Sequence, residues 1–130
     1  MKQPFSPGAQ RTYRHVVQPA DFARFPSGQV HPVYSTFALT RDAEWACRLF
    51  VLEMKEEEEE GIGTFVEVRH VSPALEGQEV LFTATLEEVK GNAVIGSFVA
   101  KVGDRVIAEG RTGQKILLRT KINALFASLQ

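Results

Sequence analysis

Residues 37–55 read FALTRDAEWACRLFVLEMK, and they carry the most regular helical pattern of the chain. Apolar side chains recur there every three or four residues, which is the spacing of an amphipathic helix. They are Leu39, Ala43, Ala46, Cys47, Phe50 and Met54. We therefore predict a helix that begins near Phe37 or Thr40, ends near Lys55, and is capped by Thr40.

Further apolar residues lie outside this stripe, namely Trp45, Leu49, Val51 and Leu52. The predicted helix is thus apolar over most of its circumference, so we expect other elements to wrap it on most sides. The acidic run Glu56 to Glu60 follows, next to the negative end of the helix dipole. We expect this run to be solvated and the helix to end there, before Gly61 and Gly63.

Beyond Gly61 the period of the pattern changes from 3.6 to 2. Residues 61–70 read GIGTFVEVRH, in which Ile62, Thr64, Val66, Val68 and His70 would share one face of a strand. Three more alternating segments follow, around residues 80–86, 94–102 and 106–116, and short turns join them. Short turns force antiparallel neighbours, since parallel strands need long crossovers.

The amino-terminal third is less regular. Residues 1–10 contain two prolines and a glycine and are predicted to be a tail, whereas residues 11–17 can form a strand. Gln18 to Ser35 contains three prolines, so we expect a loop with one helical turn near Asp21 to Phe25. Residues 121–129 are predicted to form a short closing helix.

This order of elements predicts one α+β domain over residues 11–130. The economical arrangement is a hotdog fold, in which a curved antiparallel sheet of about five strands wraps around one long central helix. Such a sheet has edge strands that need covering. We therefore expect a homodimer that pairs edge to edge, or a higher oligomer.

Composition excludes several classes of protein. The 130 residues carry a net charge of −1, which gives no reason to expect a nucleic-acid partner. The longest apolar stretches fall far short of the roughly 20 residues that span a bilayer. A single cysteine, Cys47, excludes an internal disulfide and a Cys-rich zinc site, and no metal is expected. The first residues lack the apolar core of a secretory signal, so we expect a cytoplasmic protein without a membrane partner.

Residues 34–47 resemble the fluoroacetyl-CoA thioesterase family of hotdog proteins. That family has a Thr followed eight residues later by Glu in a Glu-Trp-Ala-Cys run, and this chain has Thr36 and Glu44. The family next shows Gly-Thr with a His seven residues after the Gly, which corresponds here to Gly63 and His70. The resemblance continues without gaps over roughly residues 34–125.

The resemblance implies a dimeric acyl-CoA thioesterase that needs no cofactor beyond the CoA of its substrate. Its catalytic set would be Thr36, Glu44 and His70, with Gly63 near the thioester. Glu44 would act as nucleophile or as the base that activates water, His70 would transfer protons, and Thr36 would donate a hydrogen bond. A backbone amide near Gly63 would stabilise the oxyanion.

Two departures bear on the substrate, which we expect to be a small-to-medium acyl-CoA. The fluoroacetyl member of the family has Arg in the last strand where this chain has Gln114. The segment from Phe25-Pro26 to Thr36 is also about five residues longer here than in that member. Phe25 and Gln114 are therefore candidate substrate contacts, and specificity for fluoroacetyl does not carry over.

Each candidate also has a purely structural interpretation. His70 can be a core histidine, Thr36 a helix cap, and Glu44 one partner of a helical ion pair with Arg41 or Arg48. Cys47 lies on the apolar stripe and is predicted to be buried rather than nucleophilic. At the level of function, the alternatives are a non-catalytic dimer that binds an acyl-CoA or similar thioester and, ranked last, a dehydratase.

Overall fold

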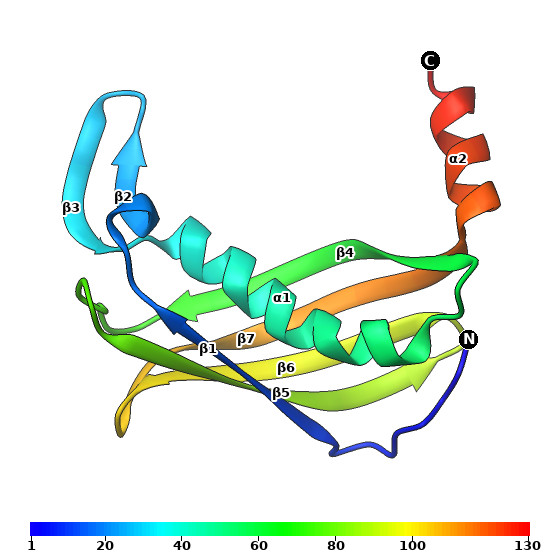
Figure 1. Ribbon diagram of the computed structural model, residues 1–130, viewed down its shortest axis with the longest axis horizontal. Helices are drawn as coiled ribbons and strands as arrows, with labels where there is room; N and C mark the ends of the chain where they lie inside the picture. Colours follow the sequence, from blue (N-terminus) through cyan, green and yellow to red (C-terminus); the bar gives the residue numbers. More distant parts are fainter.

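The computed structural model describes residues 1–130 and has five long strands, a two-stranded arm and two α-helices (Figure 1). The strands of the main sheet are β1 (Gln10–Val16), β4 (Glu59–His70), β5 (Glu79–Lys90), β6 (Ala93–Val102) and β7 (Arg105–Leu118). The helices are α1 (Thr36–Met54) and α2 (Arg119–Ser128), and a 3-10 turn covers Pro19–Asp21. The arm consists of β2 (Phe22–Phe25) and β3 (Gly28–Tyr34).

The main sheet has the order β1-β5-β6-β7-β4, and all neighbouring strands are antiparallel. Helix α1 crosses one face of this sheet, so the predicted α+β architecture with a five-stranded sheet around one long helix is confirmed (Figure 1). The arm and α2 project from opposite ends of the molecule. Strands β1 and β4 form the two edges.

The core lies between α1 and the sheet. The predicted stripe of α1 is buried, and it packs against β-strand residues such as Phe82 and Phe98. The prediction that α1 is wrapped on most sides is wrong for the single chain, because Trp45 is 40% exposed and Leu52 is 39% exposed. One sheet can cover only one side of a helix. No helix of the structure is both long enough and apolar enough to cross a bilayer.

Two local predictions need correction. The Gln18–Ser35 segment is mostly the β2–β3 arm rather than a loop, because Gly28, with a φ of +115°, allows a tight turn between the strands. Proline is tolerated in β3 because this two-stranded arm leaves backbone edges unpaired. Helix α1 begins at Thr36, near the first of the two predicted starts, but its cap is Ser35 rather than Thr40. The Ser35 side chain accepts a hydrogen bond from the Ala38 amide at 3.1 Å.

The first residues of the chain contact the rest of the protein. The Lys2 amide donates to the carbonyl of Met54 at 2.6 Å, and the rings of Phe5 and Phe50 meet edge to face. The acidic run is also less solvated than predicted, since the Glu59 carboxylate lies 3.0 Å from the amino terminus of Met1. These contacts fix the end of α1 and the start of β4.

Candidate functional site

Thr36 and His70 lie at the same end of the molecule and contact each other. Thr36 opens α1 and His70 ends β4, and the Thr36 Oγ1 lies 3.0 Å from His70 Nδ1. Burial lowers the pKa of His70, and the Ser72 backbone acts in the opposite direction to a smaller extent. The lowered pKa favours the neutral imidazole, which is the form that can accept a proton from a reacting group.

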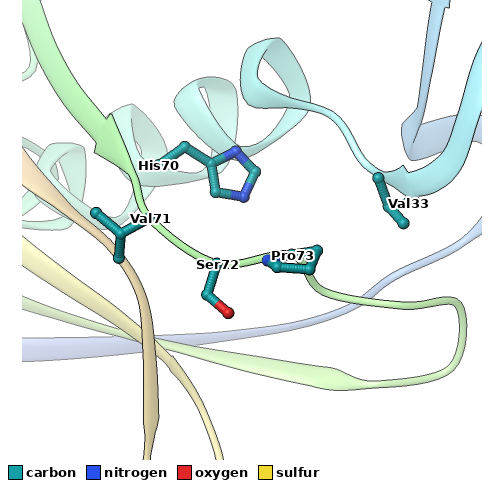
Figure 2. A pocket seen from close by; sticks show the side chains of 5 residues that line it. All are labelled: Val33, His70, Val71, Ser72 and Pro73. Atoms are coloured by element: carbon teal, nitrogen blue, oxygen red, sulfur yellow. The ribbon is translucent and has the colours of Figure 1, made fainter.

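The second ring nitrogen of His70 is buried and has no hydrogen-bond partner. The ring borders a cavity of about 250 Å³ whose other lining residues are Val33, Val71, Ser72 and Pro73 (Figure 2). From β7, the Arg105 guanidinium donates to the Ser72 hydroxyl and, at 2.6 Å, to the Pro73 carbonyl. Arg105 thereby fixes the loop that covers His70.

Glu44 lies two turns further along α1, where its carboxylate faces Gly63 of β4. A Cβ built at Gly63 would lie 3.1 Å from Glu44 Oε1, so glycine leaves room for this carboxylate. The two arginines named above as helical partners for Glu44 bind elsewhere. Arg41 pairs with Asp21 and Asp42, and Arg48 pairs with Glu60. The predicted alternative of a helical ion pair for Glu44 is therefore wrong.

A β-bulge brings Gly63 and His70 to the same face of β4. Gly63 pairs with Gln114 and Phe65 with Gly113, which leaves Thr64 as an extra residue. Residues seven apart on a regular strand would face opposite sides. The sequence predicts Ile62 and Thr64 on the same face of β4 as His70, and this is wrong for the residues before the bulge. There, Gly61 and Gly63 face α1 instead. A bulge also leaves the extra residue out of the ladder.

The remaining predicted residues lie as follows. Gln114 is 3% exposed on β7, and its Oε1 lies 3.6 Å from the position of a Cβ at Gly61. Phe25 is 55% exposed at the tip of the arm and packs edge to face on Phe37, which follows Thr36. The prediction that Cys47 is buried is confirmed, and burial raises the pKa of its thiol.

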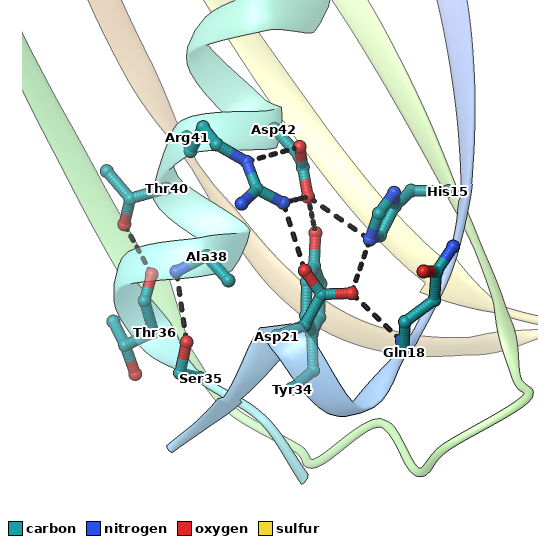
Figure 3. A network of polar contacts seen from close by, with 10 residues as sticks. All are labelled: His15, Gln18, Asp21, Tyr34, Ser35, Thr36, Ala38, Thr40, Arg41 and Asp42. Carbon is teal, nitrogen blue, oxygen red and sulfur yellow. Dashed lines mark hydrogen bonds and ion pairs between the residues drawn. The ribbon is translucent and has the colours of Figure 1, made fainter. Parts of the chain in front are cut away.

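A buried polar network near Thr36 was not predicted from the sequence (Figure 3). Asp21 Oδ2 lies 2.7 Å from His15 Nε2, and Arg41 contacts both Asp21 and Asp42. The Tyr34 hydroxyl donates to Asp42 at 2.5 Å. Burial works to raise the pKa of Asp21, but the hydrogen bonds from the Gln18 amide, His15 and Arg41 outweigh it and lower that pKa.

No sequence spacing could have signalled this network, because its members come from four separate elements. Nor does the structure contain a group of three or more His, Cys, Asp and Glu side chains that could hold a metal ion. Of the predicted catalytic residues, Thr36 and His70 meet where β4 ends, and Glu44 lies beside Gly63, further back along the strand.

The chain is similar to known proteins. Residues 17–120 match the protein family described as fluoroacetyl-CoA-specific thioesterase. The chain belongs to this thioesterase family. No curated protein sequence matches the chain.

Solved structures of related proteins share the fold of this thioesterase family member. A Thermus thermophilus protein described as a thioesterase superfamily member is 40% identical, with a TM-score of 0.93 over 98% of this chain and 94% of that one. The fluoroacetyl-CoA thioesterase FlK is 25% identical, with a TM-score of 0.90 over 98% and 99%. A hot-dog-like protein from Thermanaerovibrio acidaminovorans is 22% identical, with a TM-score of 0.86 over 95% and 92%.

Proposed function

We propose that this protein hydrolyses small-to-medium acyl-CoA thioesters at a site shared between two copies of the chain. Membership of the thioesterase family supports the reaction. Solved complexes of FlK variants contain fluoroacetate with CoA, or acetyl-CoA, so relatives bind this class of ligand. The observation that carries the proposal is the distribution of Thr36, Glu44 and His70 along β4 and α1.

Within one chain, the side chains of Thr36, Glu44 and His70 do not meet in one site. Thr36 contacts His70, whereas Glu44 faces Gly63. Gly63 and His70 are seven residues apart on β4, or about 23 Å at the rise of a strand. Thr36 and Glu44 are separated by about 12 Å along the helix axis. Each chain therefore offers two half-sites along the same edge strand, one at His70, where the strand ends, and one at Gly63, before its middle.

Pairing of β4 with its own copy would join these half-sites. An unpaired edge strand of twelve residues is a template for another strand. A two-fold dimer makes such a pair antiparallel. If the two-fold axis passes beside Glu67, so that Glu67 lies opposite its own copy, the extra residue at the bulge brings Gly63 opposite the partner's His70, and Glu44 of one chain then faces the partner's Thr36–His70 pair.

The joined site has the groups that thioester hydrolysis requires. Glu44 accepts a proton from water as the water oxygen bonds to the thioester carbonyl carbon. The backbone amide of Thr64, left out of the ladder by the bulge, is available to the oxyanion. That proton passes from Glu44 to the neutral imidazole of the partner's His70, which its Thr36 orients. The C–S bond then breaks, and the imidazolium protonates the departing thiolate. A thioester and water become a carboxylic acid and free CoA, and Glu44 and the histidine return to their starting states.

The test is hydrolysis of an acyl-CoA panel by the wild type and by Glu44→Ala, Thr36→Ala and His70→Ala. We expect each substitution to lower kcat by about 100-fold or more. Chains that carry two different tags are then co-expressed, and heterodimers are purified. A heterodimer of Glu44→Ala with His70→Ala holds one intact shared site, and we expect about half of the wild-type activity. A heterodimer of Thr36→Ala with His70→Ala is the control without an intact site.

Different results would refute the two parts of the proposal, which are the thioesterase activity and the sharing of the site between chains. If the wild type and the single variants release CoA at the same slow rate, the protein is not a thioesterase that uses these residues. Binding of CoA without turnover would favour the non-catalytic alternative. If the single variants are inactive but the Glu44→Ala and His70→Ala heterodimer recovers nothing, the site is not shared between chains.

A further inference from the structure

Helix α2 carries an apolar stripe that its own chain leaves largely uncovered. Ile122, Leu125, Phe126 and Leu129 recur at intervals of three and four residues, so they lie along one side of the helix. Only Ile122 is buried. Leu125, Phe126 and Leu129 are 51%, 55% and 75% exposed. A helix of ten residues is marginal in water on its own, so this stripe needs a surface to pack against.

The direction of α2 indicates where that surface lies. The helix begins at Arg119 and projects past β4, away from the other strands of the sheet (Figure 1). Its base is fixed beside the start of β4, because the Glu60 carboxylate lies 3.4 Å from Arg119. In a dimer that pairs β4 with its own copy, the partner lies on this side of β4. The second copy is therefore the surface that the stripe can reach.

The register of the proposed pairing gives the part of the partner that α2 meets. With Glu67 opposite its own copy and one extra residue at the bulge, residues 59–62 come level with residues 71–74 of the partner subunit. The segment 71–78 crosses the end of the sheet from β4 to β5. A two-fold rotation makes α2 of one chain project in this same direction along the partner. Helix α2 and the partner's segment 71–78 therefore lie alongside each other.

The segment 71–78 has the chemistry that suits this helix. Its Val71 and Leu75 side chains are apolar and are 59% and 51% exposed. The charges are also complementary, since α2 has two basic residues and no acidic one, whereas the segment has one acidic residue, the exposed Glu76, and no basic one. Lys121 is exposed and lies one turn before Leu125, at the border of the stripe.

We infer that the stripe of Leu125, Phe126 and Leu129 is a docking surface for a second copy of this chain and packs on residues 71–76 of the partner subunit. This inference rests on the β4 pairing of the proposed function and deepens it by naming a second contact between the chains. The chain that supplies Glu44 also supplies this helix.

The contact has a consequence for the shared site. The cavity of about 250 Å³ beside His70 is bordered by Val71, Ser72 and Pro73, which belong to the segment that α2 meets. Helix α2 of one chain therefore closes the cavity of the other. Water is kept away from the histidine, and electrostatic contacts are stronger in a site from which water is excluded.

Photo-crosslinking tests the contact directly in the full-length chain. Leu125 is replaced by p-benzoylphenylalanine, and dimers of one isotope-labelled and one unlabelled chain are irradiated. Mass spectrometry then distinguishes crosslinks between chains from those within one chain. We expect crosslinks between chains that map to residues 71–76. The matched control places the same photoreactive residue at Ala124, which is exposed on another side of the helix and should give few crosslinks to that segment.

The affinity of the dimer tests whether the stripe contributes to assembly. Leu125→Gln with Leu129→Gln makes the stripe polar, and Ala124→Gln with Ser128→Gln places the same side chains at the same spacing on another side of the helix. Analytical ultracentrifugation measures the dissociation constant. We expect the leucine pair to raise it by about tenfold or more and the control pair by less than about threefold, because only the leucines are buried between the chains.

Three results overturn the inference. They are crosslinks from Leu125 within one chain only, crosslinks between chains that map away from residues 71–76, and equal effects of the two glutamine pairs on the dissociation constant. A dimer with the expected crosslinks that hydrolyses no acyl-CoA would refute the proposed activity and leave the docking surface in place. Activity of the heterodimer of Glu44→Ala with His70→Ala, without these crosslinks, would refute the docking surface alone.

Discussion

Gly63 is the residue at which side-chain size matters most for the candidate site. Its φ is not positive, so alanine is compatible with the backbone. The new methyl group would nevertheless lie 3.1 Å from Glu44 Oε1 and displace the carboxylate. We expect Gly63→Ala to lower kcat/KM by about 10- to 100-fold, since small displacements of reacting groups are costly. The free energy of unfolding should change by less than about 1 kcal/mol.

The matched control is Gly96→Ala on β6. Its methyl group would lie 3.3 Å from Cys47 Sγ, which is similar crowding against a buried group outside the candidate site. Steady-state kinetics and urea denaturation compare the two variants. Equal losses of activity in both would show that general crowding, not the position of Glu44, explains the effect at Gly63.

The burial of His70 leads to a prediction about the pH at which its imidazole titrates. Burial disfavours the charged imidazolium, so the pKa of His70 lies below the ordinary value of about 6.5. The neutral base should therefore persist at mildly acidic pH. We expect an NMR titration, with the His70 signal assigned by its loss in His70→Gln, to give a midpoint below about 6.5. A midpoint at or above that value would mean that the ring is solvated or paired with a carboxylate in solution.

At the scale of one element, the sequence prediction and the structure differ on which residue caps α1. Thr40 suits a cap by residue type, but Ser35 lies where the helix begins and accepts the Ala38 amide. We expect Ser35→Ala to lower the free energy of unfolding by about 1 kcal/mol. Thr40→Ala should cost clearly less, because Thr40 lies within the helix and donates to the Thr36 carbonyl instead. Urea denaturation of both variants measures the difference, and equal losses would contradict the assignment of the cap.

The elements of the sheet and α1 were predictable because burial on one face imposes a period on the sequence. Their ends and irregularities were not. The bulge at Thr64 adds one residue without altering the alternation of residue types, so the predicted face was wrong for Ile62 and Thr64. The arm of β2 and β3 was not predicted, because its pairing depends on Gly28 and on short, exposed strands that have no apolar face.

The candidate site was only partly predictable from the sequence. The contact between Thr36 and His70 agrees with their assignment to one site, and the resemblance to a family supplied that assignment. The separation of Glu44 from this pair depends on how far β4 and α1 extend in space. Sequence spacing along a helix and a strand does not report which ends of two elements meet.

At the scale of the whole molecule, the polar network fastens the arm to α1 and β1. Tyr34 ends β3, is 1% exposed, and donates to the buried Asp42 carboxylate. We expect Tyr34→Phe to lower the free energy of unfolding by about 1 to 3 kcal/mol, because Asp42 loses a hydrogen bond that water cannot replace. Tyr13→Phe, on a less buried tyrosine, should change it by less than about 0.5 kcal/mol. Urea denaturation at fixed protein concentration compares them, and equal changes would contradict the role of the hydroxyl.

A site shared between two chains makes activity depend on protein concentration. When the proposed dimer dissociates on dilution, each chain keeps the Thr36–His70 contact but loses the partner's Glu44. We expect the specific activity to fall towards zero below the dissociation constant of the dimer, and the Tm to rise with concentration over about a hundredfold range, because unfolding is coupled to dissociation. Enzyme assays and calorimetry over that range, with the mass measured by light scattering, provide the test. Constant specific activity in a sample that light scattering shows to be monomeric would mean that Glu44 reaches His70 within one chain.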